Sequence, residues 1–278
     1  MVLNSYSKIN LSLSVNSLLA NGLHEIQSYF CLINLNDKIK VSIINKKKDK
    51  IIFKGQFAKE IKISNNSISN LLKLLRKLKL ITNYYSVVVT KNIPVFGGLG
   101  GGTSNAAFLL KFLLNKKLNE NILNKVEKLI GSDLRLFFYK QGFLKSLKKI
   151  NIATKKHKLY FLLIHPKVRC STRKIYLNVK KYSKKTKFNF YANRNKSRFI
   201  NYFLNSRNEL QSIVEKKYPI VKKLLTDISF EKGCYFSRMS GSGSVCYGLF
   251  ISEEATKKAL NNIKSKYPKF WFSIAKTL

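Results

Sequence analysis

Apolar and polar residues alternate along two stretches near the N-terminus, with the period of two that is typical of a half-buried strand. In the first stretch, Ile9, Leu11, Leu13 and Val15 alternate with asparagine and serine, and the second covers residues 38–44. Uninterrupted apolar runs predict further strands at 29–33, 87–89, 160–164 and 245–251. Between the first strands, Asn21-Gly22 is a strong turn signal.

Helical spacing of apolar residues, with lysines on the opposite face, predicts helices in other parts of the chain. We expect them at 69–80, 108–114, 119–130, 202–225 and 253–267. The mixture predicts an α+β protein with two lobes, residues 1–150 and residues 151–278. Residues 180–200 are polar and basic without a clear period, which predicts a mobile surface segment.

The most distinctive segment covers residues 94–107 and reads Pro-Val-Phe-Gly-Gly-Leu-Gly-Gly-Gly-Thr-Ser-Asn-Ala-Ala. So many glycines do not suit the interior of a helix or strand, yet a helix-like apolar run follows at once. Successive backbone N–H groups of such a loop can point into one concavity, and the helix start adds unpaired amides and a positive dipole end. The order strand, loop, helix therefore predicts a cradle for an anion, and a nucleotide phosphate chain fits it best. A glycine-rich turn without a ligand is the alternative interpretation.

The spacing of this loop excludes the two commoner nucleotide motifs. A Walker A loop requires lysine directly after its last glycine, where this chain has Thr103. A dinucleotide fingerprint that starts at Gly98 would require glycine at that same position. A second glycine-rich turn, residues 240–244, precedes the last predicted strand, 245–251, and we expect both glycine segments to face one cleft.

Acidic residues are scarce, which narrows the choice of a general base. Asp37 lies in a turn before a predicted strand, Asp49 lies within a lysine run, and Asp227 lies near a helix end. Asp133 differs because it follows glycine and serine at the head of an apolar run, where a carboxylate could be half-buried and aimed into a cleft. A helix N-cap is the alternative role for Asp133. Taken alone, Lys8 and His24 have the ordinary interpretation of a solvated charge and a surface-turn histidine.

The chain carries 53 lysines and arginines against 13 acidic residues, a formal net charge of +40. One interpretation is a surface that binds nucleic acid. The other is compositional drift from an A+T-rich coding sequence, since lysine is spread over the whole chain together with abundant Asn, Ile, Phe and Tyr. The even spread favours drift, so we expect no specific nucleic-acid partner. In either case self-repulsion predicts a fold whose stability depends on salt.

Chain length and the spacing of the cysteines limit the classes of protein to which this chain could belong. The 278 residues are enough for one large core or two smaller ones. No apolar run approaches the ~20 residues of a membrane span, and the first ten residues lack the pattern of a secretory signal. The cysteines have neither metal-binding nor disulfide-framework spacing: Cys31, Cys170, Cys234 and Cys246. We therefore expect a cytoplasmic protein with free thiols and no membrane contact, as a monomer or homodimer.

Four segments in this order resemble the GHMP kinase superfamily, and within it the members that act on a cytidine-diphosphate-linked methylerythritol. They are Ser7-Lys8-Ile9-Asn10-Leu11, Asn21-Gly22-Leu23-His24-Glu25-Ile26-Gln27, the glycine loop from Gly98 to Ala107, and Met239-Ser240-Gly241-Ser242-Gly243-Ser244. Two shorter matches are Gly131-Ser132-Asp133 and Asn208-Glu209-Leu210. The glycine loop points to the superfamily, and the first two segments point to this kind of member.

The resemblance implies a fold and an activity. The fold would combine an N-terminal lobe like the second domain of ribosomal protein S5 with a ferredoxin-like C-terminal lobe. The activity would be transfer of phosphate from ATP to the 2-hydroxyl of 4-diphosphocytidyl-2-C-methyl-D-erythritol, in the non-mevalonate route to isoprenoid precursors. Mg²⁺ would arrive with the ATP, because no dedicated metal cage is visible in the sequence. Kinases of the same superfamily for homoserine, mevalonate or a sugar are the nearest alternatives, and a decayed nucleic-acid-binding protein on this fold is a further one.

The resemblance also implies residue roles. Asp133 would accept the hydroxyl proton with Lys8 as its partner. Asn10 and His24 would contact the substrate, with His24 holding the cytosine. Thr172, Tyr176, Gly241 and Gly243 would complete the substrate site, with the aromatic ring of Tyr176 stacked on the base. The ATP phosphates would bind along the loop formed by Pro94, Val95, Phe96, Gly97, Gly98, Leu99, Gly100, Gly101, Gly102, Thr103 and Ser104.

The sequence departs from the family pattern at three single positions near these residues and in one stretch, Gln141-Gly142-Phe143, which lacks the family's second glycine-rich turn after the aspartate segment. Leu23 stands where the family usually has tyrosine, which removes one aromatic neighbour of the base. Phe96 occupies a usually small position at the entrance of the glycine loop. Arg135 stands where the family has an apolar residue or proline, which places a cation close in sequence to Asp133.

Overall fold

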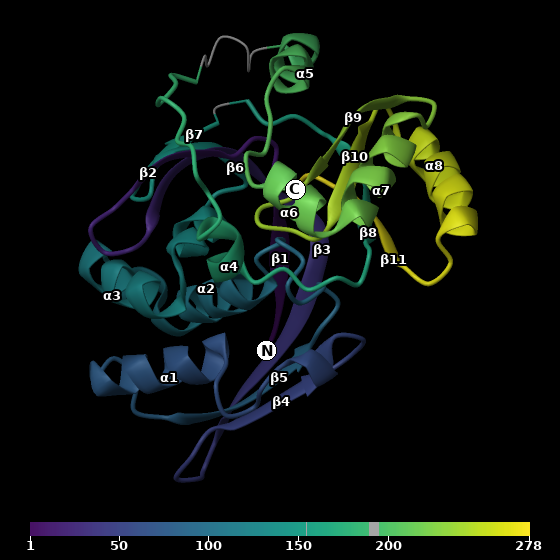
Figure 1. Cartoon of the computed structure of the whole chain (residues 1–278). Coiled ribbons are helices and arrows are strands. Elements are labelled where there is room, and N and C mark those ends of the chain that lie inside the picture. The colour runs from purple at the N-terminus through teal and green to yellow at the C-terminus, as the bar shows by residue number, and fades with distance from the viewer. Residues whose placement is uncertain (154, 189–194) are drawn as a thin grey trace. The chain divides into compact units, whose positions relative to one another are not determined.

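The structure is a computed structural model that describes residues 1–153, 155–188 and 195–278 (Figure 1). The chain forms two compact units. The first unit contains Met1–Ser7, Leu35–Val95 and Gly100–Phe138, and the second contains Lys8–Asn34, Phe96–Leu99 and Tyr139–Leu278. The predicted α+β class is confirmed, since each unit combines helices and strands. A lobe boundary at residue 150 stays a prediction.

Strands β3, β4 and β5 form the sheet of the first unit. The second half of β3 (His24–Ile44) pairs antiparallel with β5 (Tyr84–Thr90), which pairs in parallel with β4 (Lys50–Lys54). Strand β5 alternates buried and half-buried positions, as its valines predict. Strand β1 (Val2–Asn10) pairs with β3.

Helices of the first unit pack on one another at the apolar faces that their spacing predicts. Helix α1 (Ser67–Lys77) contacts α2 (Gly101–Leu114) and α3 (Glu120–Ile130). The side chain of Asn66 caps α1, and that of Asn119 caps α3 by accepting from the amide of Ile122 at 3.0 Å. Short 3₁₀ helices complete this part of the chain: η1 (Ala58–Glu60), η2 (Asn115–Lys117) and η3 (Ser132–Phe138).

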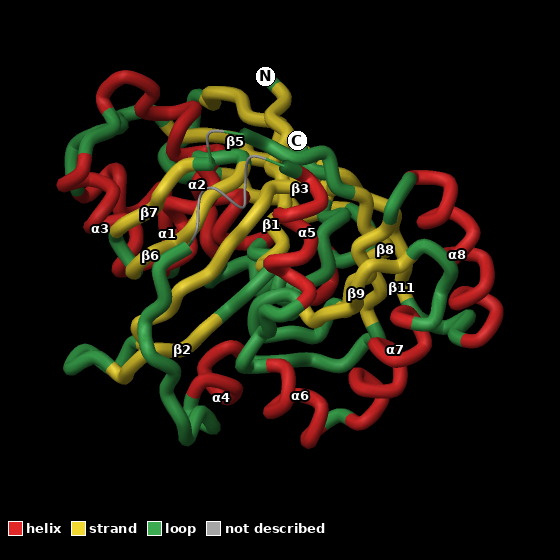
Figure 2. Tube along the Cα trace, turned by 90° about the horizontal axis from the view of Figure 1, so that it is seen from above, coloured by secondary structure: helices red, strands yellow, loops and turns green. Residues whose placement is uncertain are grey.

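The second unit contains an antiparallel sheet with the order β11-β8-β10-β9. Helices α7 (Pro219–Ser229) and α8 (Glu253–Lys266) pack against this sheet, as Figures 1 and 2 show. The strands are β8 (Tyr160–His165), β9 (Cys234–Met239), β10 (Cys246–Phe250) and β11 (Trp271–Lys276). The same unit holds β2 (Ser14–Leu18), β6 (Gln141–Ser146), β7 (Lys149–Ile152), α4 (Thr172–Tyr176), α5 (Lys196–Leu204) and α6 (Gln211–Lys217).

Two strand predictions near the N-terminus need correction. Residues 29–33 and 38–44 belong to one continuous strand, β3, rather than to two. The alternating stretch from Ile9 to Val15 is interrupted, because β1 ends at Asn10 and β2 starts at Ser14. The four apolar side chains of that stretch are nevertheless all buried. The alternation therefore identified the buried face correctly but not the break in the backbone pairing.

Most of the described residues in the stretch 180–200 are exposed, as predicted for a surface segment, but Phe188, Phe199 and Ile200 are buried. Its mobility stays a prediction, and residues 189–194 lie outside the described residues. The ring of Phe188 is buried and stacks on Phe143 with ring centroids 5.2 Å apart. Phe199, on α5, is fully buried. The amide of Ser183 donates to the carbonyl of Val15 at 2.9 Å. Aromatic residues within a basic stretch thus attach these parts to the second unit.

Candidate functional site

Glycine is required in the first part of the glycine-rich loop. Gly98 has φ +73°, and a Cβ atom there would lie 2.0 Å from the carbonyl oxygen of Ser240. Two amides at the end of the second glycine turn and directly after it donate to this part of the loop. Ser244 donates to the carbonyl of Phe96 at 3.2 Å, and Val245 donates to that of Gly97 at 3.1 Å. Within the second unit, the two glycine segments therefore lie against each other.

The remaining part of the loop starts helix α2 in the first unit. Its N-cap is Gly100, with φ +71°, which has no side chain to accept from the first amides of the helix. A Cβ atom at Gly101 would lie 2.9 Å from Cγ2 of Ile93. The helix start thus packs closely on the chain beneath it, while its first amides carry no side-chain cap. Such an N-terminus favours an anion.

A buried ion pair lies directly beneath this helix start. Asp37 is 0% exposed and Lys91 is 2% exposed, and the lysine donates a hydrogen bond to Oδ2 of the aspartate. Asn105, on α2, accepts from the same lysine at 3.1 Å and donates to Asp37 at 2.9 Å. Oδ1 of Asp37 accepts from the amides of Asn92 and Ile93 at 2.8 and 2.9 Å. The network ties α2 to the strand end that leads into the glycine loop, and the sequence did not single it out.

Asp133 lies in η3, with Arg135 two residues further on. The guanidinium of Arg135 donates to Glu120 at 2.7 and 3.0 Å and forms an ion pair with Glu127 at 2.8 Å. Both glutamates belong to α3. Arg135, which departs from the family pattern, is therefore paired with two carboxylates of the neighbouring helix α3.

Lys8 is buried, so its interpretation as a solvated strand-end charge is wrong. Its ammonium group donates to Oδ1 of Asn10 at 2.5 Å, and the amide group of Asn10 donates to Ser28 at 2.7 Å. A Cβ atom at Gly241 would lie 3.2 Å from Nζ of Lys8 and 3.3 Å from Oδ1 of Asn10. The predicted residues Lys8, Asn10 and Gly241 thus meet within the second unit.

Asn208 braces this arrangement. Its amide group donates to the carbonyls of Met239 and Gly241 at 2.8 and 2.7 Å, which fixes the second glycine turn. The only sequence signal for Asn208 was the short match to the family at residues 208–210.

His24, Tyr176 and Tyr182 form a cluster of rings. The ring centroid of His24 lies 5.1 Å from that of Tyr176 and 6.1 Å from that of Tyr182. Burial lowers the pKa of His24 below its usual value, so its imidazole is neutral at pH 7. Thr172, at the start of α4, shares a 2.8 Å hydrogen bond with the hydroxyl of Ser242. Tyr182 was missed in the sequence because it lies in the stretch that was predicted to be a mobile surface segment.

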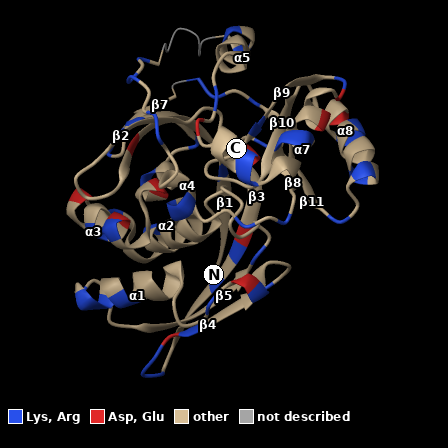
Figure 3. Ribbon diagram, in the orientation of Figure 1, with Lys and Arg blue, Asp and Glu red and all other residues tan. Residues whose placement is uncertain are grey.

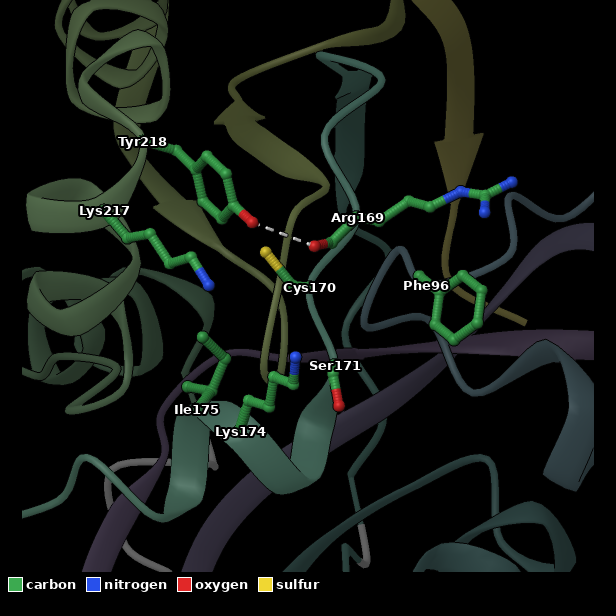
Figure 4. A pocket seen from close by; sticks show the side chains of 8 residues that line it. All are labelled: Phe96, Arg169, Cys170, Ser171, Lys174, Ile175, Lys217 and Tyr218. Atoms are coloured by element: carbon green, nitrogen blue, oxygen red, sulfur yellow. Dashed lines mark hydrogen bonds between the residues drawn. The ribbon is translucent and has the colours of Figure 1, made fainter.

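A pocket of about 220 Å³ opens beside these residues in the second unit, and we call it the basic pocket (Figure 4). The side chains of Lys174 and Lys217 point into it around Cys170, whereas the guanidinium of Arg169 leads away past Phe96. Phe96 has φ +56° and is 46% exposed. The lining consists of Phe96, Arg169, Cys170, Ser171, Lys174, Ile175, Lys217 and Tyr218.

The predicted site residues divide between the two units. Lys8, Asn10, His24, Thr172, Tyr176, Gly241 and Gly243 belong to the second unit, together with residues 96–99 of the loop. Asp133 and residues 94–95 and 100–104 belong to the first. The meeting of Lys8 with Asp133 stays a prediction.

Lysine and arginine lie on elements of both units and do not gather on one (Figure 3). All four cysteines are free, as predicted. Within the described part of the chain, no helix has the length and apolar character needed to cross a membrane.

Comparison with known families matches both parts of the chain. The family described as "GHMP kinases N terminal domain" matches residues 66–135, and the family described as "GHMP kinases C terminal" matches residues 192–269. A protein of Pelagibacter ubique named 4-diphosphocytidyl-2-C-methyl-D-erythritol kinase is 37% identical over 279 aligned residues, covering 99% of this chain and 98% of that protein. A protein of the same name from Wolbachia pipientis is 30% identical and covers 95% of this chain and 94% of its own length.

Solved structures share the fold. The crystal structure of a 4-(cytidine 5'-diphospho)-2C-methyl-D-erythritol kinase matches with a TM-score of 0.74 at 20% identity, over 99% of each chain. A mevalonate kinase of L. major in complex with R-mevalonate matches with a TM-score of 0.69 at 14% identity, over 100% of this chain and 95% of its own.

Proposed function

Because the chain belongs to the GHMP kinase family, we propose that it transfers the γ-phosphoryl group of ATP to the 2-hydroxyl of 4-diphosphocytidyl-2-C-methyl-D-erythritol. The products are ADP and the 2-phosphate of the substrate, in the non-mevalonate route to isoprenoid precursors. The observation that carries this proposal is the 37% identity, over nearly the whole of both chains, to a kinase named for this substrate.

We propose that the phosphates of ATP bind along residues 94–104. The support is local: glycines with positive φ at 98 and 100 and an N-terminus of α2 without a side-chain cap. Backbone amides in this arrangement bind phosphate oxygens and favour the negative charge through the helix dipole. The buried network of Lys91, Asp37 and Asn105 supports the helix start from below.

For the transfer itself we propose that Asp133 accepts the proton of the attacking hydroxyl and that Lys8 is its partner. A nearby ammonium group favours the ionised form of a carboxylate and helps to orient the hydroxyl. Phosphoryl transfer depends on positioning and charge stabilisation more than on covalent catalysis. The hydrogen bond from Lys8 to Asn10 supports this assignment, because it fixes the ammonium beside the second glycine turn.

We propose that Mg²⁺ binds to the protein together with ATP. The described residues contain no cluster of three histidine, cysteine or acidic side chains that could hold a metal. We propose that the ion arrives bound to the phosphate oxygens of ATP, which are ligands that Mg²⁺ prefers. When bound, Mg²⁺ neutralises charge that develops on the phosphates.

We propose that the cytidine end of the substrate binds at His24 and Tyr176, and that Asn10, Thr172, Gly241 and Gly243 complete the substrate site. A neutral imidazole can donate from one nitrogen and accept at the other, which suits the edge of cytosine. The ring of Tyr176 offers a face for stacking on the base.

We also propose that the protein is located in the cytoplasm, because its scattered free thiols fit a reducing compartment.

The test is an ADP-release assay with purified protein, ATP, Mg²⁺ and the cytidyl substrate, beside homoserine, mevalonate and galactose. We expect turnover with the cytidyl substrate alone, and a loss of about 10²- to 10⁴-fold in Asp133→Asn. Equal release from wild type and Asp133→Asn would reject the proposal. Turnover of another alcohol that survives His24→Ala would favour a different GHMP kinase. Salt-sensitive RNA binding that ATP leaves unchanged would favour a nucleic-acid role.

A further inference from the structure

Two of the three cationic residues that line the basic pocket point their charged groups into it. Lys174 and Lys217 direct their ammonium groups around Cys170 from α4 and from the end of α6 (Figure 4). Within the described residues, neither ammonium has a carboxylate oxygen within 4.0 Å. Two like charges that converge on one pocket raise the energy of the protein unless an anion joins them.

The floor of the pocket does not supply this anion. Burial raises the pKa of the Cys170 thiol to about 11, although the ammonium of Lys217 acts in the opposite direction. The thiol is therefore neutral at pH 7. The nearby hydroxyl of Tyr218 donates its hydrogen to the carbonyl of Arg169 at 3.2 Å.

The pocket lies on a different face of α4 from the predicted substrate contacts. Thr172 and Tyr176 are four residues apart and so share one face of the helix, where they meet Ser242 and His24. Lys174 lies on the opposite face, about 200° around the axis from Thr172. The basic pocket is therefore separate from the proposed cytidine site.

We propose that the basic pocket binds a phosphate or diphosphate group. Lys174 and Lys217 supply two ammonium groups, and Ser171 supplies a hydroxyl donor at the same opening. A volume of about 220 Å³ accommodates such a group together with a small substituent, for which Phe96 and Ile175 offer apolar walls. Charge-assisted hydrogen bonds of this kind are strong for phosphate oxygens. This site goes beyond the proposed function and does not require it.

The test measures the affinity of the whole protein for inorganic phosphate and for pyrophosphate by calorimetry and thermal shift, at constant ionic strength set with NaCl. Saturating ADP is added in a parallel series to fill a nucleotide site. The test variant is Lys174→Met with Lys217→Met. Its matched control, Lys216→Met with Lys223→Met, removes the same charge from exposed positions on α6 and α7.

We expect the pocket variant to bind pyrophosphate about tenfold more weakly, while the control variant binds as the wild type does. Equal affinity in all three proteins, or equal loss in both variants, would overturn the proposal, because binding would then follow the overall charge. A normal thermal unfolding curve for the pocket variant shows that it is folded. None of these measurements needs turnover, so they stand even where the kinase proposal fails.

A kinetic comparison identifies the source of the bound group. A raised KM for the cytidyl substrate with unchanged kcat in the pocket variant assigns the pocket to the diphosphate of that substrate. An unchanged KM together with lost pyrophosphate binding assigns it to a separate phosphorylated ligand.

Discussion

Individual side chains in the second unit were harder to interpret from sequence than the motifs that contain them. Lys8 has the local pattern of a solvated charge, yet it is buried, and the distant Gly241 lies against its ammonium group. Tyr182 lies beside His24 in a segment whose Ser183 amide donates to the carbonyl of the distant Val15. Local periodicity does not contain such contacts between distant segments. The family resemblance identified Lys8 and His24 but gave no signal for Tyr182.

The ring cluster predicts the effect of removing Tyr176. Stacking of a base on an aromatic side chain contributes about 1–3 kcal/mol, so Tyr176→Leu is expected to raise KM for the cytidyl substrate about five- to hundredfold. We expect kcat to stay within about twofold, because the base is remote from the reacting hydroxyl. Tyr235→Leu, on β9, is the control and should leave both constants unchanged. A fall in kcat at constant KM would contradict the assignment.

His165 predicts acid sensitivity. Burial, with Lys167 nearby, lowers its pKa to about 4, and within the described residues neither ring nitrogen has a hydrogen-bond partner. Below pH 6.5 the unfolded chain binds a proton that the folded protein does not, so stability falls as the pH drops from about 6.5 to about 4. The full loss is about 3 kcal/mol. Urea unfolding across this range should show a smaller pH dependence in His165→Leu than in the wild type, and equal slopes would contradict the prediction.

At the scale of elements, the sequence predicted most helices and strands but divided β3 in two. The division followed from Asn34, Asn36 and Asp37, which are typical of a turn. In the structure the strand continues because Asp37 is bonded to Lys91, Asn105 and two backbone amides. A buried polar residue that is fully paired can remain inside a strand. The sequence offers no sign of that pairing, since Lys91 is 54 positions away.

The same network predicts how α2 responds to mutation. Asp37→Asn keeps the shape of the side chain but leaves the buried ammonium of Lys91 without its carboxylate, which should cost about 3–5 kcal/mol in the free energy of unfolding. Urea unfolding of Asp37→Asn measures this loss. Asp37→Asn combined with Lys91→Met should be less destabilised than the sum of the two single variants. Additive losses would show that the ion pair does not act as a unit.

At the scale of the whole molecule, the net charge of +40 predicts an effect of salt on the stability of the fold. Lysine and arginine occupy elements of both units, so most of them repel neighbours of the same sign (Figure 3). Raising NaCl from about 0.02 M to about 0.5 M shortens the Debye length from about 20 Å to about 4 Å and screens this repulsion. The melting temperature should therefore rise, by about 2–4 °C for each kcal/mol recovered.

A charge-reduced variant separates this effect from a general action of salt on proteins. Lys46, Lys47 and Lys48 are exposed and adjacent, and changing all three to glutamine lowers the net charge without touching a buried contact. This variant should melt at a higher temperature than the wild type in low salt, and its melting temperature should rise less as NaCl is added. Differential scanning calorimetry gives both values. An equal rise in the two proteins would mean that salt acts through burial of apolar surface instead, and the excess of lysine would then carry no measurable cost for the fold.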